Sequence, residues 1–225
     1  LEDDARRQEE FTEAFSHELK TPLTSIIGYS DMLRSMDLPK EDIVTSASYI
    51  FKEGKRLERL AYKMMELSFA GRQEIEMAAT DTEELAEKIQ KNAECLLKPK
   101  KIILTTNIEK GIIKGDMDLL QSLFLNLIDN ARKACSEGGR IILEGQDYGG
   151  EYKFYVKDNG CGIPESETEK ITEAFYMVDK SRARKEGGAG IGLALCVKIA
   201  GLHKAGFEIK SSEGTGTQVI LSFKK

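Results

Sequence analysis

The stretch Ser16-His17-Glu18-Leu19-Lys20-Thr21-Pro22-Leu23 lies within a segment whose apolar residues recur at steps of three and four. This spacing over residues 2–36 predicts one long helix with a single buried stripe. His17 falls beside the stripe, so we expect its side chain to face outward. Pro22 removes the N–H that would bond the Glu18 carbonyl, and an interior proline costs a helix about 3 kcal/mol. A lone exposed histidine is usually without a role, although a local function could explain this cost.

A second helix is predicted from about residue 41 to residue 70, after a short break at 37–40. Its steps alternate between four and three, the spacing of a heptad seam formed by Ile43, Ala47, Ile50, Gly54, Leu57, Ala61, Met64 and Ser68. Two such helices make an antiparallel hairpin, which buries too little apolar surface to be stable alone. We therefore predict that residues 1–72 form a dimerisation domain, in which residues 1–70 of two copies make a homodimeric four-helix bundle.

The hydrophobic pattern changes from purely helical to mixed helix and strand after a predicted linker at residues 73–80. Residues 81–225 mix helices and strands without a regular alternation between them, and several strands are antiparallel neighbours. Helices are expected at 81–98, 116–134 and 191–205, and strands at 102–105, 140–147, 151–158, 206–212 and 217–223. The second domain is thus predicted to be an α+β or mixed α/β sandwich.

Composition and charge exclude several classes of protein. The 225 residues carry 33 Lys and Arg against 38 Asp and Glu, a net charge of −5, which argues against a nucleic-acid partner. The most apolar stretch, about residues 188–202, is too short and too polar to span a membrane. The chain begins with Leu1 rather than Met, which indicates a piece of a longer protein. We expect a cytoplasmic location, with any membrane anchor in segments outside this chain.

Two glycine-rich segments predict close approach of the backbone to a ligand. In Asp158-Asn159-Gly160-Cys161-Gly162-Ile163-Pro164, a carboxylate at the end of a strand can accept a hydrogen bond from an exocyclic amine such as that of adenine. An ordinary turn explains this segment equally well. In residues 187–193, four glycines precede an apolar helix, whose N-terminal N–H groups suit phosphate oxygens. A cationic loop at residues 180–185 precedes these glycines and suits a lid over phosphates.

A pair of asparagines marks the helix expected at residues 116–134. Asn126 and Asn130 lie four residues apart and share one helical face, with Lys133 on the same side. Two amide oxygens among apolar neighbours suit a hard cation such as Mg²⁺, together with nucleotide phosphates. The alternative is a pair of ordinary surface amides.

In their order along the chain, these segments resemble the conserved boxes of the sensor histidine kinases of two-component signalling. The matching segments are residues 16–23, 126–131, 158–164, 175–182, 188–193 and 214–217. The resemblance covers nearly the whole chain. It implies a dimeric phosphoacceptor hairpin followed by an ATP-binding domain of the gyrase/Hsp90-like sandwich type.

The resemblance also implies a reaction. ATP would phosphorylate His17, and the phosphoryl group would pass to an aspartate of a response regulator. Glu18 would assist proton transfer, and Thr21 would position water when the enzyme dephosphorylates the regulator.

For the ATP site, the resemblance implies that Asn126 and Asn130 hold Mg²⁺ and phosphates, with Lys133 nearby, and that Asp158 bonds adenine. The other implied nucleotide contacts are Gly160, Gly162, Lys180, Arg182, Gly188, Gly190, Gly192, Leu193 and Thr217.

Two competing functions remain open at this point. An ATP-driven conformational machine without phosphohistidine would share the second domain, but it would not need the His17–Pro22 segment. ATP-hydrolysing relatives generally carry a glutamate where this chain has Asn126. The second competing function is that of a degenerate kinase that serves only as a dimeric binding module.

The heptad seam generates a prediction about assembly. Residues 1–75 alone should run as a dimer in size-exclusion chromatography with light scattering, because one hairpin cannot bury the seam. Residues 80–225 should run as a monomer. A folded but monomeric 1–75 fragment would refute the four-helix bundle.

Overall fold

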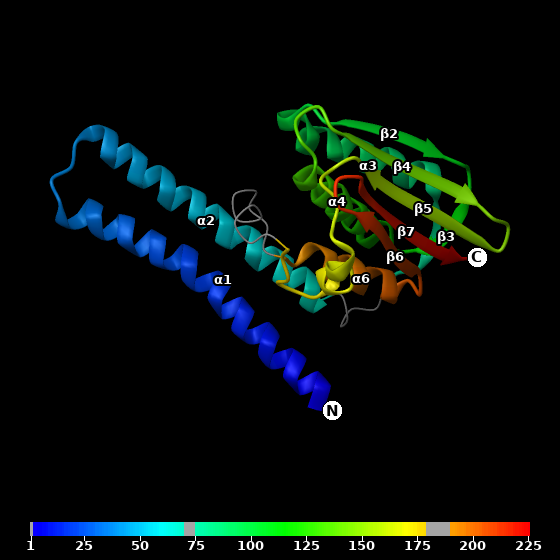
Figure 1. The fold of residues 1–225 in the computed structure, drawn as a ribbon, viewed down its shortest axis with the longest axis horizontal. Helices are drawn as coiled ribbons and strands as arrows, with labels where there is room; N and C mark the ends of the chain where they lie inside the picture. The colour runs from blue at the N-terminus through cyan, green and yellow to red at the C-terminus, as the bar shows by residue number, and fades with distance from the viewer. Residues whose placement is uncertain (1, 70–74, 179–189) are drawn as a thin grey trace.

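The structure is a computed structural model that describes residues 2–69, 75–178 and 190–225. Helices α1 (Glu2–Ser35) and α2 (Lys40–Phe69) lie side by side as an antiparallel hairpin (Figure 1). Helix α1 continues through Pro22, whose ring is buried. The predicted helical hairpin is therefore confirmed. Among the described residues, no helix has both the length and the apolar composition that a membrane span requires.

The second domain begins earlier than the sequence predicted. Residues 78–80, which we expected in the linker, belong to strand β1 (Ala78–Asp81), which pairs antiparallel with β3 (Ile112–Gly115). The Thr80 hydroxyl is buried and donates to the Gly115 carbonyl at 3.0 Å. Strands this short carry too little alternation to be recognised in a sequence. The predicted boundary at residue 72 lies outside the described residues.

A five-stranded sheet forms one layer of the second domain. Its strand order is β2-β4-β5-β7-β6, and only the β2–β4 pair is parallel. The strands are β2 (Ile103–Ile108), β4 (Arg140–Asp147), β5 (Glu151–Asp158), β6 (Gly206–Ser212) and β7 (Gly216–Lys224). The hairpin predicted at residues 140–158 is confirmed with both strands at the expected bounds.

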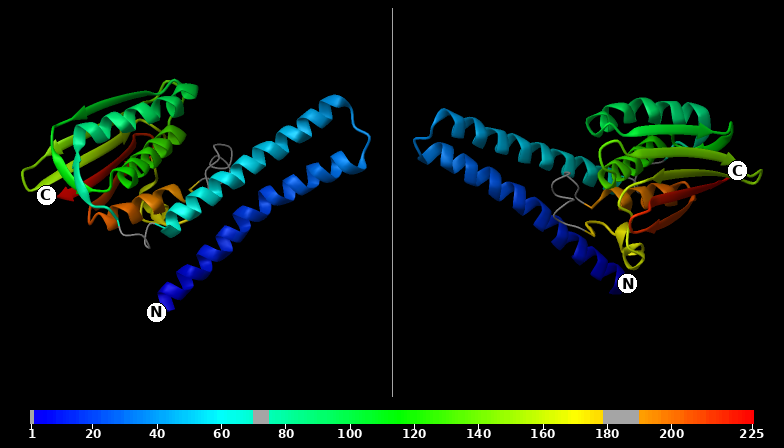
Figure 2. Two further views of the ribbon diagram at one scale, coloured as in Figure 1. Left: turned by 180° about the vertical axis from the view of Figure 1, so that it is seen from behind. Right: turned by 45° about the horizontal axis from the view of Figure 1, so that its top comes forward.

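Helices cover one face of this sheet (Figure 2). They are α3 (Thr82–Leu97), α4 (Met117–Ala134) and α6 (Gly192–Leu202), with short 3-10 turns at Lys98–Lys100, Glu165–Glu167 and Lys170–Thr172. The core lies between the helices and the sheet. At its centre, the Phe154 ring lies 4.9 Å from the Phe124 ring and 4.8 Å from the Tyr152 ring. The predicted two-layer sandwich is confirmed.

The central position of Phe154 leads to a prediction about stability. Phe154→Ala should lower the free energy of unfolding by about 3–5 kcal/mol, because the cavity would lie under a closed helical layer. Ile103→Ala is the matched control, since this side chain is 58% exposed on an edge strand, and it should change the value by less than about 0.5 kcal/mol. Urea denaturation followed by circular dichroism measures the free energy of unfolding of both variants. Equal losses in the two would contradict a core centred on Phe154.

Candidate functional site

Helix α4 presents an apolar face to the core and a polar face to the start of α6. Asp116 caps its N-terminus, accepting from the N–H groups of Asp118 and Leu119 at 3.0 Å each, as the sequence predicted. The buried stripe consists of Leu120, Leu123, Phe124, Leu127, Ile128 and Ala131. Because this stripe fixes the rotation of the helix, the asparagines on its other side have defined positions.

Asn126 and Asn130 both lie against Gly192, the first residue of α6. A Cβ on Gly192 would lie 3.4 Å from Asn126 Oδ1, 3.5 Å from Asn130 Oδ1 and 3.6 Å from Asn130 Nδ2. Asn130 Nδ2 is buried and has no hydrogen-bond partner among the described residues, although an unpaired buried amide is costly. Two converging oxygens and an unpaired amide fit a Mg²⁺–phosphate group, because Mg²⁺ takes oxygen ligands.

Asp158 ends strand β5 beside a hollow of about 400 Å³ that Thr217 also lines. Its Oδ1 accepts from the N–H groups of Gly160 at 2.8 Å and Thr217 at 3.3 Å. Burial raises the pKa of Asp158, and these two hydrogen bonds act in the opposite direction. Neither bond uses Oδ2, so this oxygen can accept from a ligand.

Glycine is required where chain segments meet beside Asp158. Gly216 has a φ of +96°, and a Cβ there would lie 2.0 Å from the Asp158 carbonyl oxygen. Gly162 has a φ of +69°, and its Cβ would lie 2.0 Å from the Ser212 carbonyl oxygen. The motif at residues 214–217 pointed to this region, but we did not single out Gly216 as a site residue.

Phe175 and Gly190, on either side of the predicted lid in the sequence, are in contact next to the site. The Phe175 N–H donates to the Gly190 carbonyl at 2.9 Å, and a Cβ on Gly190 would lie 2.7 Å from the Phe175 carbonyl carbon. Leu193 lies half-buried in the first turn of α6. Lys180, Arg182 and Gly188 lie outside the described residues.

Lys133 forms an ion pair along α4. Its Nζ lies 2.5 Å from Asp129 Oδ2, and Arg132 bonds the other oxygen of the same carboxylate. Burial raises the pKa of Asp129, but Lys133 and Arg132 outweigh it and the pKa is lowered. Lys133 thus lies near the asparagines, with its charge already paired with the Asp129 carboxylate.

His17 is exposed on α1, as the sequence predicted. The Thr21 hydroxyl donates to the His17 carbonyl at 3.3 Å. The Glu18 side chain is buried towards α2, where its Oε2 accepts from Arg56 at 2.8 Å. In the described part of the chain, no hydrogen bond or ion pair joins His17 to Asn126 or Asn130.

Sequence reasoning missed Lys63 in helix α2. Its Nζ donates to Asn126 Oδ1 at 3.1 Å, and burial, followed by the charge of Lys133, lowers the pKa of Lys63. One turn away, Ser122 Oγ donates to Glu66 Oε1 at 3.4 Å. Lys63 precedes Met64 of the heptad seam, but nothing in the sequence pairs it with a residue 63 positions later.

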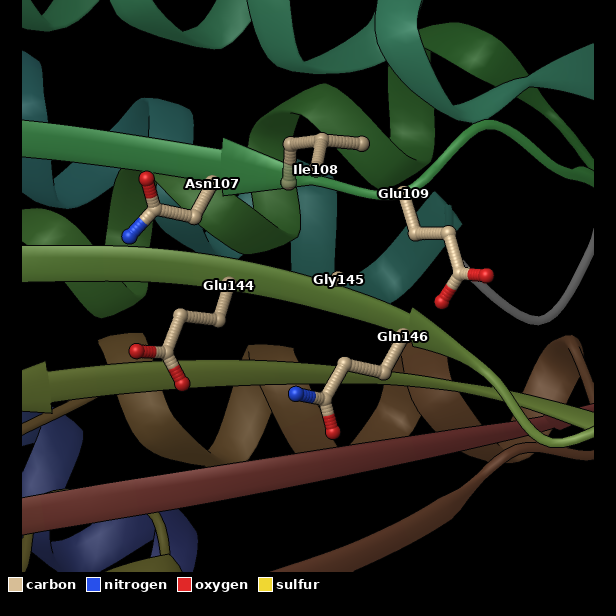
Figure 3. A pocket seen from close by; sticks show the side chains of 6 residues that line it. All are labelled: Asn107, Ile108, Glu109, Glu144, Gly145 and Gln146. Atoms are coloured by element: carbon tan, nitrogen blue, oxygen red, sulfur yellow. The ribbon is translucent and has the colours of Figure 1, made fainter.

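A second hollow, of about 480 Å³, lies over the sheet at β2 and β4 (Figure 3). Asn107, Glu144 and Gln146 line it, together with Ile108, Glu109 and Gly145. None of the residues that the sequence predicted for the site lies in it. The site therefore comprises the asparagine face of α4, the start of α6 and the end of β5.

Comparisons with known proteins agree with this geometry. Residues 7–73 match the family model "His Kinase A (phospho-acceptor) domain". Residues 115–225 match "Histidine kinase-, DNA gyrase B-, and HSP90-like ATPase". The chain belongs to the sensor histidine kinase family. The chain is 30% identical over 221 residues to sensor histidine kinase YkoH of Bacillus subtilis, a match that covers 97% of this chain and 48% of YkoH. It spans less than half the length of the curated relatives it matches.

Solved structures share the fold of this kinase. Histidine kinase ThkA in complex with response regulator protein TrrA matches with a TM-score of 0.78 and 24% identity, over 100% of this chain and 65% of that one. Full-length ShkA in complex with AMPPNP matches with a TM-score of 0.69 and 24% identity, over 96% and 45%. At this identity, the likeness shows the fold alone.

The raised pKa of Asp158 predicts a gain of stability in Asp158→Asn. Because burial raises the pKa of Asp158, the native state holds the ionised carboxylate less favourably than the unfolded chain does. This penalty disappears below the unfolded pKa of about 3.9. The neutral amide keeps an oxygen for Gly160 and Thr217, so calorimetry should show a higher Tm at pH 7 and a smaller gain at pH 4. A lower Tm at pH 7 would contradict this account.

Proposed function

We propose that this kinase binds Mg²⁺ and ATP in its second domain, phosphorylates itself on His17, and passes the phosphoryl group to an aspartate of a response regulator. We further propose that it dephosphorylates that regulator. The observation that carries the proposal is the convergence of Asn126 and Asn130 on the start of α6, in a chain that also exposes a histidine beside a helix proline.

Nucleotide binding follows from the site as built. Asp158 Oδ2 would accept from the adenine amine, while the N–H groups of Gly160 and Thr217 hold Oδ1 in place. The N-terminus of α6 would face the phosphates, where helix N–H groups favour negative charge. Asn126 and Asn130 would hold Mg²⁺, which supplies positive charge against the triphosphate. The AMPPNP bound in the related ShkA structure supports this use of the fold.

Phosphoryl transfer requires a nucleophile without a bound proton on the attacking atom. A neutral imidazole offers one such nitrogen. This nitrogen of His17 would attack the γ-phosphorus, the bond from phosphorus to the bridging oxygen would break, and ADP would leave. The proton on the other ring nitrogen must then go to an acceptor. Glu18 would take this proton, and its ion pair with Arg56 would be partly broken as it does so.

The proposed partners are a second copy of this chain and a receiver domain. Several large apolar side chains of the hairpin are exposed in a single chain, among them Ile27 at 65%, Phe51 at 69% and Tyr62 at 64%. A second hairpin would cover such side chains, which supports the homodimer. The related ThkA was solved in complex with a response regulator, which supports the second partner.

The first test concerns the phosphoacceptor. His17→Ala should abolish incorporation of label from γ-labelled ATP and leave ADP affinity unchanged, because among the described residues no hydrogen bond or ion pair joins the exposed His17 side chain to Asp158 or α4. The label on the original protein should be lost in acid and kept in base, as expected for a phosphorus–nitrogen bond. Label that persists on His17→Ala protein would overturn the assignment.

The second test concerns recognition of the adenine base. The original protein should bind GTP much more weakly than ATP, since guanine presents a carbonyl where adenine presents its amine. Asp158→Asn should weaken ATP and ADP alike by roughly 1.5–3 kcal/mol, the value of a hydrogen bond to a charged group. Calorimetric titration measures these affinities. Equal affinity for ATP and GTP in the original would show that Asp158 is only a turn residue.

A further inference from the structure

The hairpin places a lysine on the oxygen that we assign to the metal ion. Lys63 Nζ lies 3.1 Å from Asn126 Oδ1, while Asn126 Nδ2 donates to the Ser122 carbonyl at 2.9 Å. This second bond orients the amide, so that its oxygen faces both Lys63 and Gly192. A positive charge from the first domain therefore already occupies the proposed metal ligand.

The lysine is held there by packing on both sides of it along α2. Leu60 is buried, and Met64 packs beside it, in a cluster with Phe175 and Ile191 of the second domain. Phe175, in the left-handed region at a φ of +68°, has its ring centroid 5.2 Å from that of Phe11 in α1. Lys63 is partly buried between these contacts, and turning its charge towards this apolar surface would be unfavourable, so its release from Asn126 is coupled to separation of α2 from α4 and α6.

The docked arrangement also keeps His17 from the site. Phe15 and Leu19 of α1 pack against the same apolar cluster, and His17, two residues from each, is exposed on another side of the helix. The ATP-binding domain must therefore leave this position before its nucleotide can meet the histidine of the same chain.

We propose that Lys63 is a tethered cation that takes the place of Mg²⁺ at Asn126, so that docking of the hairpin and binding of the Mg²⁺–nucleotide complex exclude each other. Two cations cannot share one amide oxygen without strong repulsion. Binding of the metal-loaded nucleotide thus releases the second domain from the hairpin and permits its movement towards His17. The inference rests on the proposed function, because it takes Asn126 as a metal ligand.

The test compares nucleotide binding in a freely moving and a permanently docked protein. In the full chain, Cys95 and Cys161 are replaced by serine, and Glu66→Cys and Ser122→Cys are joined by a short bismaleimide across the contact between α2 and α4. Calorimetry then gives the affinity for ADP with Mg²⁺ and with EDTA. Before joining, Mg²⁺ should tighten ADP binding by about tenfold or more. After joining, this enhancement should vanish while the metal-free affinity changes by less than about twofold.

Two further variants of the joined protein identify the cause. Lys63→Met removes the charge but keeps the aliphatic length, so the Mg²⁺ enhancement should return. Lys52→Met, an exposed lysine on the same helix, is the matched control and should leave the enhancement absent. An enhancement that survives joining, or that stays absent in joined Lys63→Met protein, would overturn the proposal. If the unjoined protein shows no Mg²⁺ enhancement, the metal assignment of the proposed function itself fails.

Discussion

Helix α4 packs one face into the core and presents two asparagines to the start of α6, and the rest of the site depends on this double role. Its buried stripe locks it against the sheet, which leaves no freedom to rotate Asn126 and Asn130. Gly192 is the first residue of α6 and lies next to the same two amides. A Cβ at this position would be in contact with both amide oxygens. The core packing of α4 therefore sets the positions of both asparagines.

The end of β5 shows a cost in stability at the proposed adenine contact. Asp158 is buried enough to raise its pKa, and the residues around it place only two N–H groups on one oxygen. Glycines let the neighbouring chain segments approach its backbone closely. A carboxylate held in this way is poorly satisfied by the protein alone, which is the condition under which a ligand amine is bound selectively.

Local patterns in the sequence predicted the elements well and the contacts between residues far apart in the chain poorly. The helical spacing of residues 2–36, the alternation over 140–158 and the cap at Asp116 all act within a few residues, and the structure confirms them. The pairing of β1 with β3 was missed, because four residues carry no readable period. Glu18 with Arg56 and Lys63 with Asn126 join residues 38 and 63 positions apart, and a single sequence holds no signal for such pairs.

The most direct test of the central claim is a crystal structure of this chain with Mg²⁺ and AMPPNP. The account predicts that Asp158 accepts from the adenine amine at about 2.9 Å. It also predicts that amide oxygens of Asn126 and Asn130 lie about 2.1 Å from Mg²⁺, with Lys63 withdrawn from Asn126. A nucleotide bound away from Asp158, or a metal ion that touches neither asparagine, would contradict it.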